Sequence, residues 1–124
     1  MSGGVEPGEL ESGAVVDALE VALEMAPLPA DEVTAGSPSA GYAVLGHIGV
    51  GGDALEVGVW EMTDGTATDV EVDEVFVVLA GSATVEIEGI ATPLELNPGT
   101  VVRLSAGMRT VWTVHERLRK FVVS

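Results

Sequence analysis

The sequence has 124 residues, which is long enough for one domain with a sizeable hydrophobic core. Twenty acidic residues against five basic ones give a formal net charge of −15, so neither nucleic acids nor anionic membranes are expected as partners. The lack of cysteine excludes disulfides and thiolate metal sites, and the 16 glycines favour many short strands over a helical bundle.

The N-terminal region divides into a tail and the start of the domain. Residues 1–13 are rich in Gly and Glu, which predicts a flexible tail before one domain over residues 14–124. Apolar residues at helical spacing within residues 14–25 predict a short amphipathic helix capped by Ser12. Apolar residues also alternate from Val21 onward, so an edge strand at the end of this segment stays open.

Short β-rich runs separated by Gly, Pro and Asn turns fill the rest of the chain. They predict strands at residues 42–48, 55–62, 93–96, 101–104, 110–114 and 121–123, in addition to the central stretch described next. So many antiparallel strands in one small domain must protect their edges, and a closed barrel or jelly roll does so. Because no signal-peptide pattern and no apolar run of roughly 18 residues is present, we expect a cytoplasmic location.

Residues 71–88 are the stretch around which the other strands are arranged. A β-branched and aromatic run, Val75–Ala80, precedes Gly81-Ser82, and apolar and polar residues alternate after it. This pattern predicts a hairpin that turns at Gly81-Ser82. Its predicted core residues are Phe76, Val78, Val85 and Ile87.

Glu74 stands immediately before this apolar run. By alternation it shares a face with Thr68, Val70, Val72, Phe76 and Val78. A carboxylate on a buried face needs a proton, a cation or hydrogen bonds, and we expect one of Lys120, Arg103 or Arg109 to pair with it. The competing interpretation places both Glu74 and Lys120 in solvent, as is common for such residues.

The charges are distributed unevenly. Nineteen of the twenty carboxylates precede residue 96, whereas every cation lies beyond residue 102: Arg103, Arg109, Arg117, Arg119 and Lys120. We favour pairing of the C-terminal strands with acidic neighbours over an anion site built by these cations, because surface ion pairs are common. The acidic balance also fits a saline environment, in which excess carboxylates raise solubility.

Several short motifs resemble the cupins, a family of small β-barrels, over roughly residues 26–124. Glu74 and Gly81 have the glutamate-to-glycine spacing of the first cupin motif, and Gly99 with Gly107 resembles part of the second. A narrower resemblance is to the small cupins typified by (S)-ureidoglycine aminohydrolase. It rests on Ala35–Pro38, Gly58–Glu61, Asn97–Gly99, Ala106-Gly107 with Trp112, and Arg119–Val122. The resemblance implies an RmlC-like jelly-roll barrel that forms a homodimer through its sheets.

The resemblance also implies a metal site, and here the sequence departs from the family. The histidine positions of the two motifs fall on Thr68, Val70 and Thr110, none of which is a strong metal ligand. The chain's two histidines, His47 and His115, lie outside the motifs and are interpreted as surface residues. We therefore expect no bound metal and no cofactor. A weak site with Glu74 would need both imidazoles to turn inward.

The resulting pocket has apolar walls and a few polar anchors, which is typical of a small-molecule site. We expect it to be lined by Thr68, Val70, Glu74, Phe76, Thr110 and Trp112, with Trp60 and Lys120 from neighbouring strands. The two tryptophans fit plain core packing equally well. We interpret the chain as a cupin that binds a small polar or anionic molecule without a tightly held metal. Two alternatives stay open: an aminohydrolase-like or other cupin enzyme with a non-standard metal site, and a dimer-forming interaction module.

Overall fold

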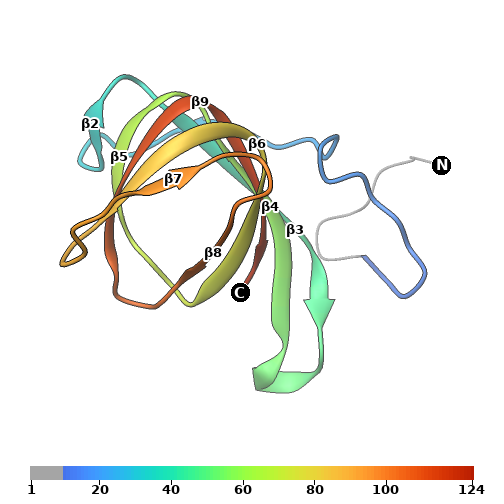
Figure 1. Ribbon diagram of the computed structural model, residues 1–124. Coiled ribbons are helices and arrows are strands. Elements are labelled where there is room, and N and C mark those ends of the chain that lie inside the picture. The colour runs from blue at the N-terminus through green and yellow to red at the C-terminus, as the bar shows by residue number, and fades with distance from the viewer. Residues whose placement is uncertain (1–9) are drawn as a thin grey trace.

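Two long strands form the middle of the sheet in the computed structural model, which describes residues 10–124 (Figure 1). These strands, β6 (Glu74–Ile87) and β9 (Arg109–Val123), pair antiparallel along most of their length. The other neighbours of β9 are β4 (Leu55–Met62) and β5 (Gly65–Val70), and those of β6 are β7 (Leu94–Leu96) and β8 (Val101–Leu104). The remaining strands are β1 (Ala26–Pro27) and β3 (Ser39–Ile48) beyond β4, and β2 (Val33–Ala35) beyond β5.

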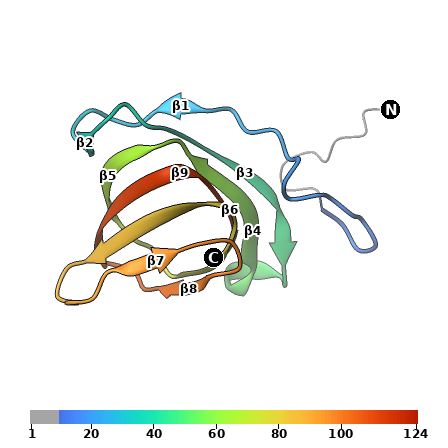
Figure 2. The same ribbon diagram turned by 45° about the horizontal axis from the view of Figure 1, so that its top comes forward.

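The sheet curls around one main core, as the turned view shows (Figure 2). The four residues predicted for this core, Phe76, Val78, Val85 and Ile87, are all buried. The predicted all-β barrel is therefore confirmed. The strands expected at 55–62 and 101–104 have those bounds, whereas the two expected at 110–114 and 121–123 are parts of the single strand β9.

The predicted hairpin turn at Gly81-Ser82 is wrong, because β6 continues through both residues. The register against β9 shifts between Val78 and Ala83, which is the mark of a β-bulge. Gly81 has a φ of 87°, and a Cβ atom on it would lie 2.0 Å from the carbonyl oxygen of Arg117. Glycine is therefore required where β9 crosses closely. The bulge also changes the alternation, so that Val78 before it and Ala83 after it both face the core.

The predicted N-terminal helix is also wrong for the described residues. Asp17 ends any helical run locally, because its side chain and its carbonyl accept hydrogen bonds from Leu19 N and Glu20 N, each at 2.9 Å. Residues 10–25, which we call the N-terminal strap, instead run across the outside of the barrel and pack on a second core of Leu45, Val57 and Val59. Leu10 N donates to Leu45 O at 2.7 Å, and residues 1–9 lie outside the described part, so the tail boundary at residue 13 stays a prediction.

One carboxylate and two arginines fasten the strap to the sheet. Glu61 of β4 accepts hydrogen bonds from Arg119 Nε at 2.7 Å and from Arg117 Nε. Arg119 Nη1 also donates to the carbonyls of Ala18 and Val21, at 2.9 Å each. Burial raises the pKa of Glu61, but the arginine hydrogen bonds outweigh it, so the pKa lies below its ordinary value of 4.5. These two cations thus pair with an acidic neighbour, as the favoured interpretation of the charge distribution predicts.

Replacing Arg119 should destabilise the fold more than replacing Arg117. Arg119→Gln leaves the buried Glu61 with one exposed partner and should lower the free energy of unfolding by about 3 kcal/mol. Arg117→Gln, the matched control, should cost at most about 1 kcal/mol because its side chain is exposed. Urea unfolding at pH 7 measures both, and equal losses would contradict these roles.

The contact between Glu61 and Arg119 also makes the stability of the fold depend on pH, in a direction that follows from the pKa shift. Because the pKa of Glu61 is lowered in the folded state, its contribution to stability is complete above the unfolded value of 4.5 and is lost as the pH falls through the folded pKa. The difference in unfolding free energy between the parent and Arg119→Gln should therefore shrink below pH 4.5.

Candidate functional site

The barrel contains a cavity of about 360 Å³ between β4, β5 and β9, which we call the inner cavity. Its size lies within the range of small-molecule sites. Both tryptophans of the chain and several carboxylates contribute to its walls. It is lined by Leu28, Glu32, Tyr42, Glu56, Trp60, Met62, Ala67, Thr68, Asp69, Glu71, Val72, Glu74, Trp112, Lys120, Val122 and Ser124.

A buried ion pair lies in the wall of the inner cavity. Lys120 Nζ is 3.1 Å from Glu74 Oε2, and the two residues are exposed to only 6% and 9%. Of the three cations considered as partners for Glu74, the structure therefore places Lys120 beside it. The backbone register explains it, because Lys120 of β9 stands between Trp60 of β4 and Val78 of β6 and points into the barrel.

Three aromatic rings surround the ammonium of Lys120, and we call them the aromatic box. Lys120 Nζ lies 4.2 Å from the ring centre of Phe76 and 4.6 Å from those of Trp60 and Trp112. A cation held over aromatic faces away from water gains about 2 kcal/mol or more from a favourable contact, against about 0.5–1 kcal/mol at an exposed site. Burial lowers the pKa of Lys120, and the neighbouring charge of Glu74 offsets only part of this effect.

Glu71 is a second buried carboxylate at the site, and the sequence prediction missed it. It is 6% exposed, and its Oε2 accepts hydrogen bonds from Thr110 Oγ1 at 2.6 Å and from Trp112 Nε1 at 3.0 Å. The indole that shapes the cavity is thus oriented by a carboxylate on the adjoining segment. The signal that could have found Glu71 is the alternation of Ala67, Asp69 and Glu71.

The residues before Glu74 that were predicted to share its buried face are wrong by one position along the chain. Ala67 pairs with the inward-facing Trp112 and is buried, whereas Val70 is 54% exposed. The error has a physical cause. Residues 71–73 lie between β5 and β6 and are not part of a strand, so the alternation that is valid after Glu74 cannot be extended back through them.

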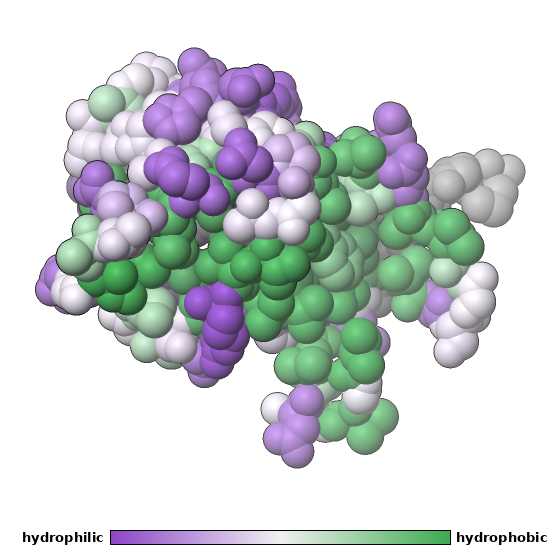
Figure 3. Space-filling view, viewed as in Figure 1, coloured by the Kyte–Doolittle hydropathy of each residue, from purple (hydrophilic) through white to green (hydrophobic). Residues whose placement is uncertain are grey.

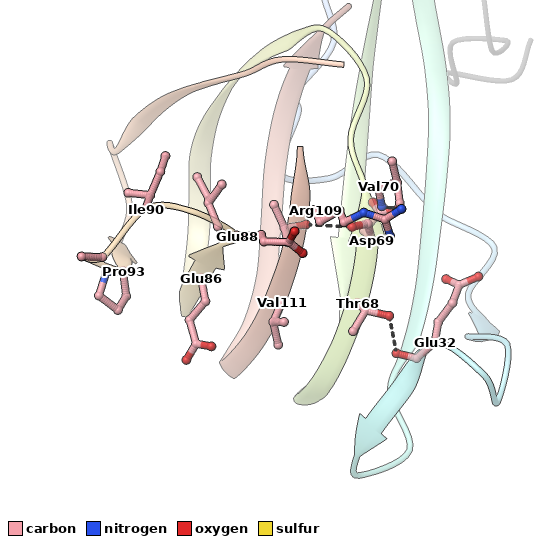
Figure 4. Close-up of a pocket in the computed structure, with 13 residues that line it drawn as sticks. Glu32, Thr68, Asp69, Val70, Glu86, Glu88, Ile90, Pro93, Arg109 and Val111 are labelled. Atoms are coloured by element: carbon pink, nitrogen blue, oxygen red, sulfur yellow. Dashed lines mark hydrogen bonds between the residues drawn. The ribbon is translucent and has the colours of Figure 1, made fainter. Parts of the chain in front are cut away.

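A second, wider groove of about 820 Å³ lies at the rim of the barrel and is drawn in Figure 4. It runs along β5, β9 and the end of β6, under the loop that carries Ile90 and Pro93. It meets the inner cavity at Glu32, Thr68 and Asp69, which line both. Most of its other side chains are open to solvent, so we place the polar anchor of the site in the inner cavity.

The eight predicted pocket residues therefore fall into three groups. The inner cavity is lined by Thr68, Glu74, Trp112, Trp60 and Lys120. Val70 and Thr110 line the rim groove instead, with Thr110 buried against Glu71. Phe76 lines neither space, because it is buried in the core beneath Lys120 and packs on Trp112 with ring centres 5.7 Å apart.

The side chains of the inner cavity do not fit a metal ion. In residues 10–124 no group of three or more His, Cys, Asp or Glu side chains is arranged to hold one. Glu74, at the position of the cupin carboxylate ligand, already has an ammonium beside it. Both histidines are exposed, as predicted: His47 lies 3.7 Å from Glu56 Oε1, and His115 Nε2 is 2.9 Å from Thr84 Oγ1.

Comparison with protein families shows to which family this barrel belongs. The family described as the EutQ-like cupin domain matches residues 51–121. The chain belongs to the EutQ-like cupin domain family. The predicted membership of the cupins is thus confirmed, and the match includes β4 to β8 and most of β9.

Solved structures similar to this EutQ-like cupin support the fold. A protein of unknown function from Pseudomonas syringae superposes with a TM-score of 0.72 at 22% identity, over 87% of this chain and 46% of that one. This chain therefore spans less than half of that protein. A putative ethanolamine utilization protein Q from Salmonella typhimurium gives 0.55 at 20% identity, over 68% of each chain. A protein of unknown function from Acidithiobacillus ferrooxidans gives 0.58 at 20% identity, over 90% of this chain and all of that one. Among curated proteins no match is found.

In the part of this EutQ-like cupin from residue 10 onward, no helix has the length and apolar character needed to cross a bilayer.

Proposed function

We propose that this EutQ-like cupin binds a small polar molecule in the inner cavity, with the Glu74–Lys120 pair as its polar anchor and without a tightly held metal. The observation that supports this function is a buried ion pair beside an open space of about 360 Å³. Replacing such a pair by hydrophobic side chains often stabilises a protein, so the pair fits a binding role better than a packing role.

The charges around the cavity favour a molecule that is not anionic. Five carboxylates line it, from Glu32, Glu56, Asp69, Glu71 and Glu74, against the single ammonium of Lys120. An anion would meet more repulsion than attraction there. This narrows the expectation of a polar or anionic ligand to a polar one.

Binding is testable by the fluorescence of the chain's two tryptophans, because both line the inner cavity. A panel of small ureides, amines and carboxylates at millimolar concentration should contain compounds that change the tryptophan emission and raise the melting temperature. Glu74→Gln keeps the shape and an amide oxygen that can still accept from Lys120, but removes the charge, so it should weaken that binding at least about tenfold and alter binding more than folding.

Glu86→Gln is the matched control, because Glu86 is an exposed carboxylate on the same strand and does not line the inner cavity. It should bind like the parent. If no compound changes the emission, or if Glu74→Gln binds every compound like the parent, the site is misplaced.

An aminohydrolase-like or other cupin enzyme is the second candidate, and the resemblance of Gly58–Glu61 and Arg119–Val122 to the ureidoglycine aminohydrolase cupins favours it. Metal analysis of protein purified without a histidine tag separates the two candidates. Stoichiometric Mn, Fe, Ni or Zn that is lost in Glu74→Ala would contradict the metal-free proposal and support the enzyme.

Association into a homodimer also belongs to this proposal. The β3–β4 hairpin projects from the barrel, and the surface in that region is largely hydrophobic (Figures 1 and 3). Ile48, Val50 and Leu55 of this region are exposed. Light scattering that shows a monomer at high protein concentration would contradict the dimer.

A further inference from the structure

Most hydrogen-bond donors around the inner cavity are already used within the protein. Tyr42 Oη donates to Glu56 Oε2 at 2.7 Å, Trp112 Nε1 to Glu71 at 3.0 Å, and Lys120 Nζ to Glu74 at 3.1 Å. The indole N–H of Trp60 and the other two N–H groups of Lys120 have no hydrogen-bond partner among the described residues, and three aromatic rings enclose the ammonium. A ligand rich in acceptors would therefore find only these donors.

The acceptors, in contrast, are only partly used. Glu71 and Glu74 each have one oxygen that accepts from the described residues, through Oε2, while Oε1 of each accepts no hydrogen bond from them. In the part of the chain that the structure describes, no enclosed side-chain nitrogen or oxygen lacks a partner. Both Oε1 atoms must therefore be reached by solvent, although their residues are exposed to only 6% and 9%. The space that both residues line is the inner cavity.

The charges and the aromatic walls of the inner cavity also favour a positively charged ligand. Burial raises the pKa of Asp69, and the neighbouring charge of Glu71 raises it further, as expected for carboxylates crowded around one space. The aromatic box already holds one ammonium, that of Lys120, so the indole faces here are suited to a positive charge.

We propose that the inner cavity selects a small organic cation with N–H groups, of the alkylammonium or guanidinium class, and that the free oxygens of Glu71 and Glu74 accept its hydrogen bonds. The inference rests on the proposed function, because it names the chemical class of the molecule bound there. Charge-assisted hydrogen bonds to two buried carboxylates supply the selectivity over a neutral molecule of the same shape.

Three probes of similar size separate charge from shape: methylguanidinium, methylurea and acetate, each titrated into the full chain and followed by tryptophan fluorescence and melting temperature. Methylguanidinium should bind at least about tenfold more tightly than methylurea, and acetate should not bind at the same concentrations. Glu71→Gln can still accept from Thr110 and Trp112, and it should weaken methylguanidinium binding about tenfold. Glu20→Gln, which removes an exposed carboxylate of the strap, should leave it unchanged.

Lys120→Met should strengthen methylguanidinium binding, whereas Glu71→Gln should weaken it. With the competing ammonium removed, methylguanidinium should bind more tightly and raise the melting temperature of this variant more than that of the parent. An anion site would instead lose its acetate binding. The Glu71→Gln comparison does not depend on how well Lys120→Met folds.

The outcomes separate the two proposals. Equal or tighter binding of methylurea or acetate at the cavity overturns the cation class and leaves the small-molecule site standing. If none of the three probes changes the fluorescence or the melting temperature, the cation class is overturned, and the small-molecule site is overturned only if the wider panel of ureides, amines and carboxylates also fails to bind.

Discussion

Lys120→Met should lower the free energy of unfolding by about 3 to 5 kcal/mol, because it leaves the carboxylate of Glu74 buried without its cation. The ammonium is also removed from the aromatic box, so the contacts with Trp60, Phe76 and Trp112 are lost. Urea unfolding at pH 7 measures the change. Arg103→Met is the matched control, because Arg103 pairs with the exposed Asp73 at 3.4 Å, and it should cost less than about 1 kcal/mol.

Removing both charges should recover most of this loss. Burial lowers the pKa of Lys120 in spite of Glu74, which means that desolvation of the ammonium outweighs the attraction of its partner. The double variant Glu74→Leu/Lys120→Met should therefore be nearly as stable as the parent, while ligand binding is lost. A double variant whose loss is the sum of two large single losses would contradict a coupled pair.

Phe76→Ala should cost about 3 to 5 kcal/mol, since the ring is 1% exposed at the centre of the core. The cavity left behind adjoins Trp112, so the tryptophan emission should shift as well. The control is Val75→Ala on the opposite, exposed face of the same strand, and it should cost under about 1 kcal/mol. A near-neutral Phe76→Ala would show that the register of β6 is displaced by one residue.

Sequence reasoning was reliable where one strand repeats one simple pattern. The bounds of β4 and β8 and the burial of Phe76 follow from alternation, and the cost of burying an unpaired charge predicts a cation beside Glu74, with Lys120 as one of three candidates. It failed where contact with a partner strand, and not the local pattern, determines the backbone conformation. Gly81-Ser82 suits a turn as well as a bulge, and only the close passage of β9 at Arg117 selects the bulge.

The other errors have the same origin. The alternation before Glu74 does not continue through residues 71–73, which break the strand, so Val70 is exposed and the buried Glu71 escapes a prediction based on it. The pattern of residues 14–25 fits a helix or an extended segment. The turn at Asp17 and the hydrogen bonds from Arg119, 98 and 101 residues away along the chain, hold it extended.

The central position of β9 has a consequence for synthesis on the ribosome. β9 pairs with β4, β5 and β6, all of which are translated before it. A nascent chain that has emerged only as far as β8 therefore exposes unpaired strand edges, which are prone to aggregate. The barrel can close, and the ammonium can enter its aromatic surroundings, only after residues 109–123 have left the exit tunnel. Folding of this small domain is therefore expected to be slow, with non-local contacts forming late.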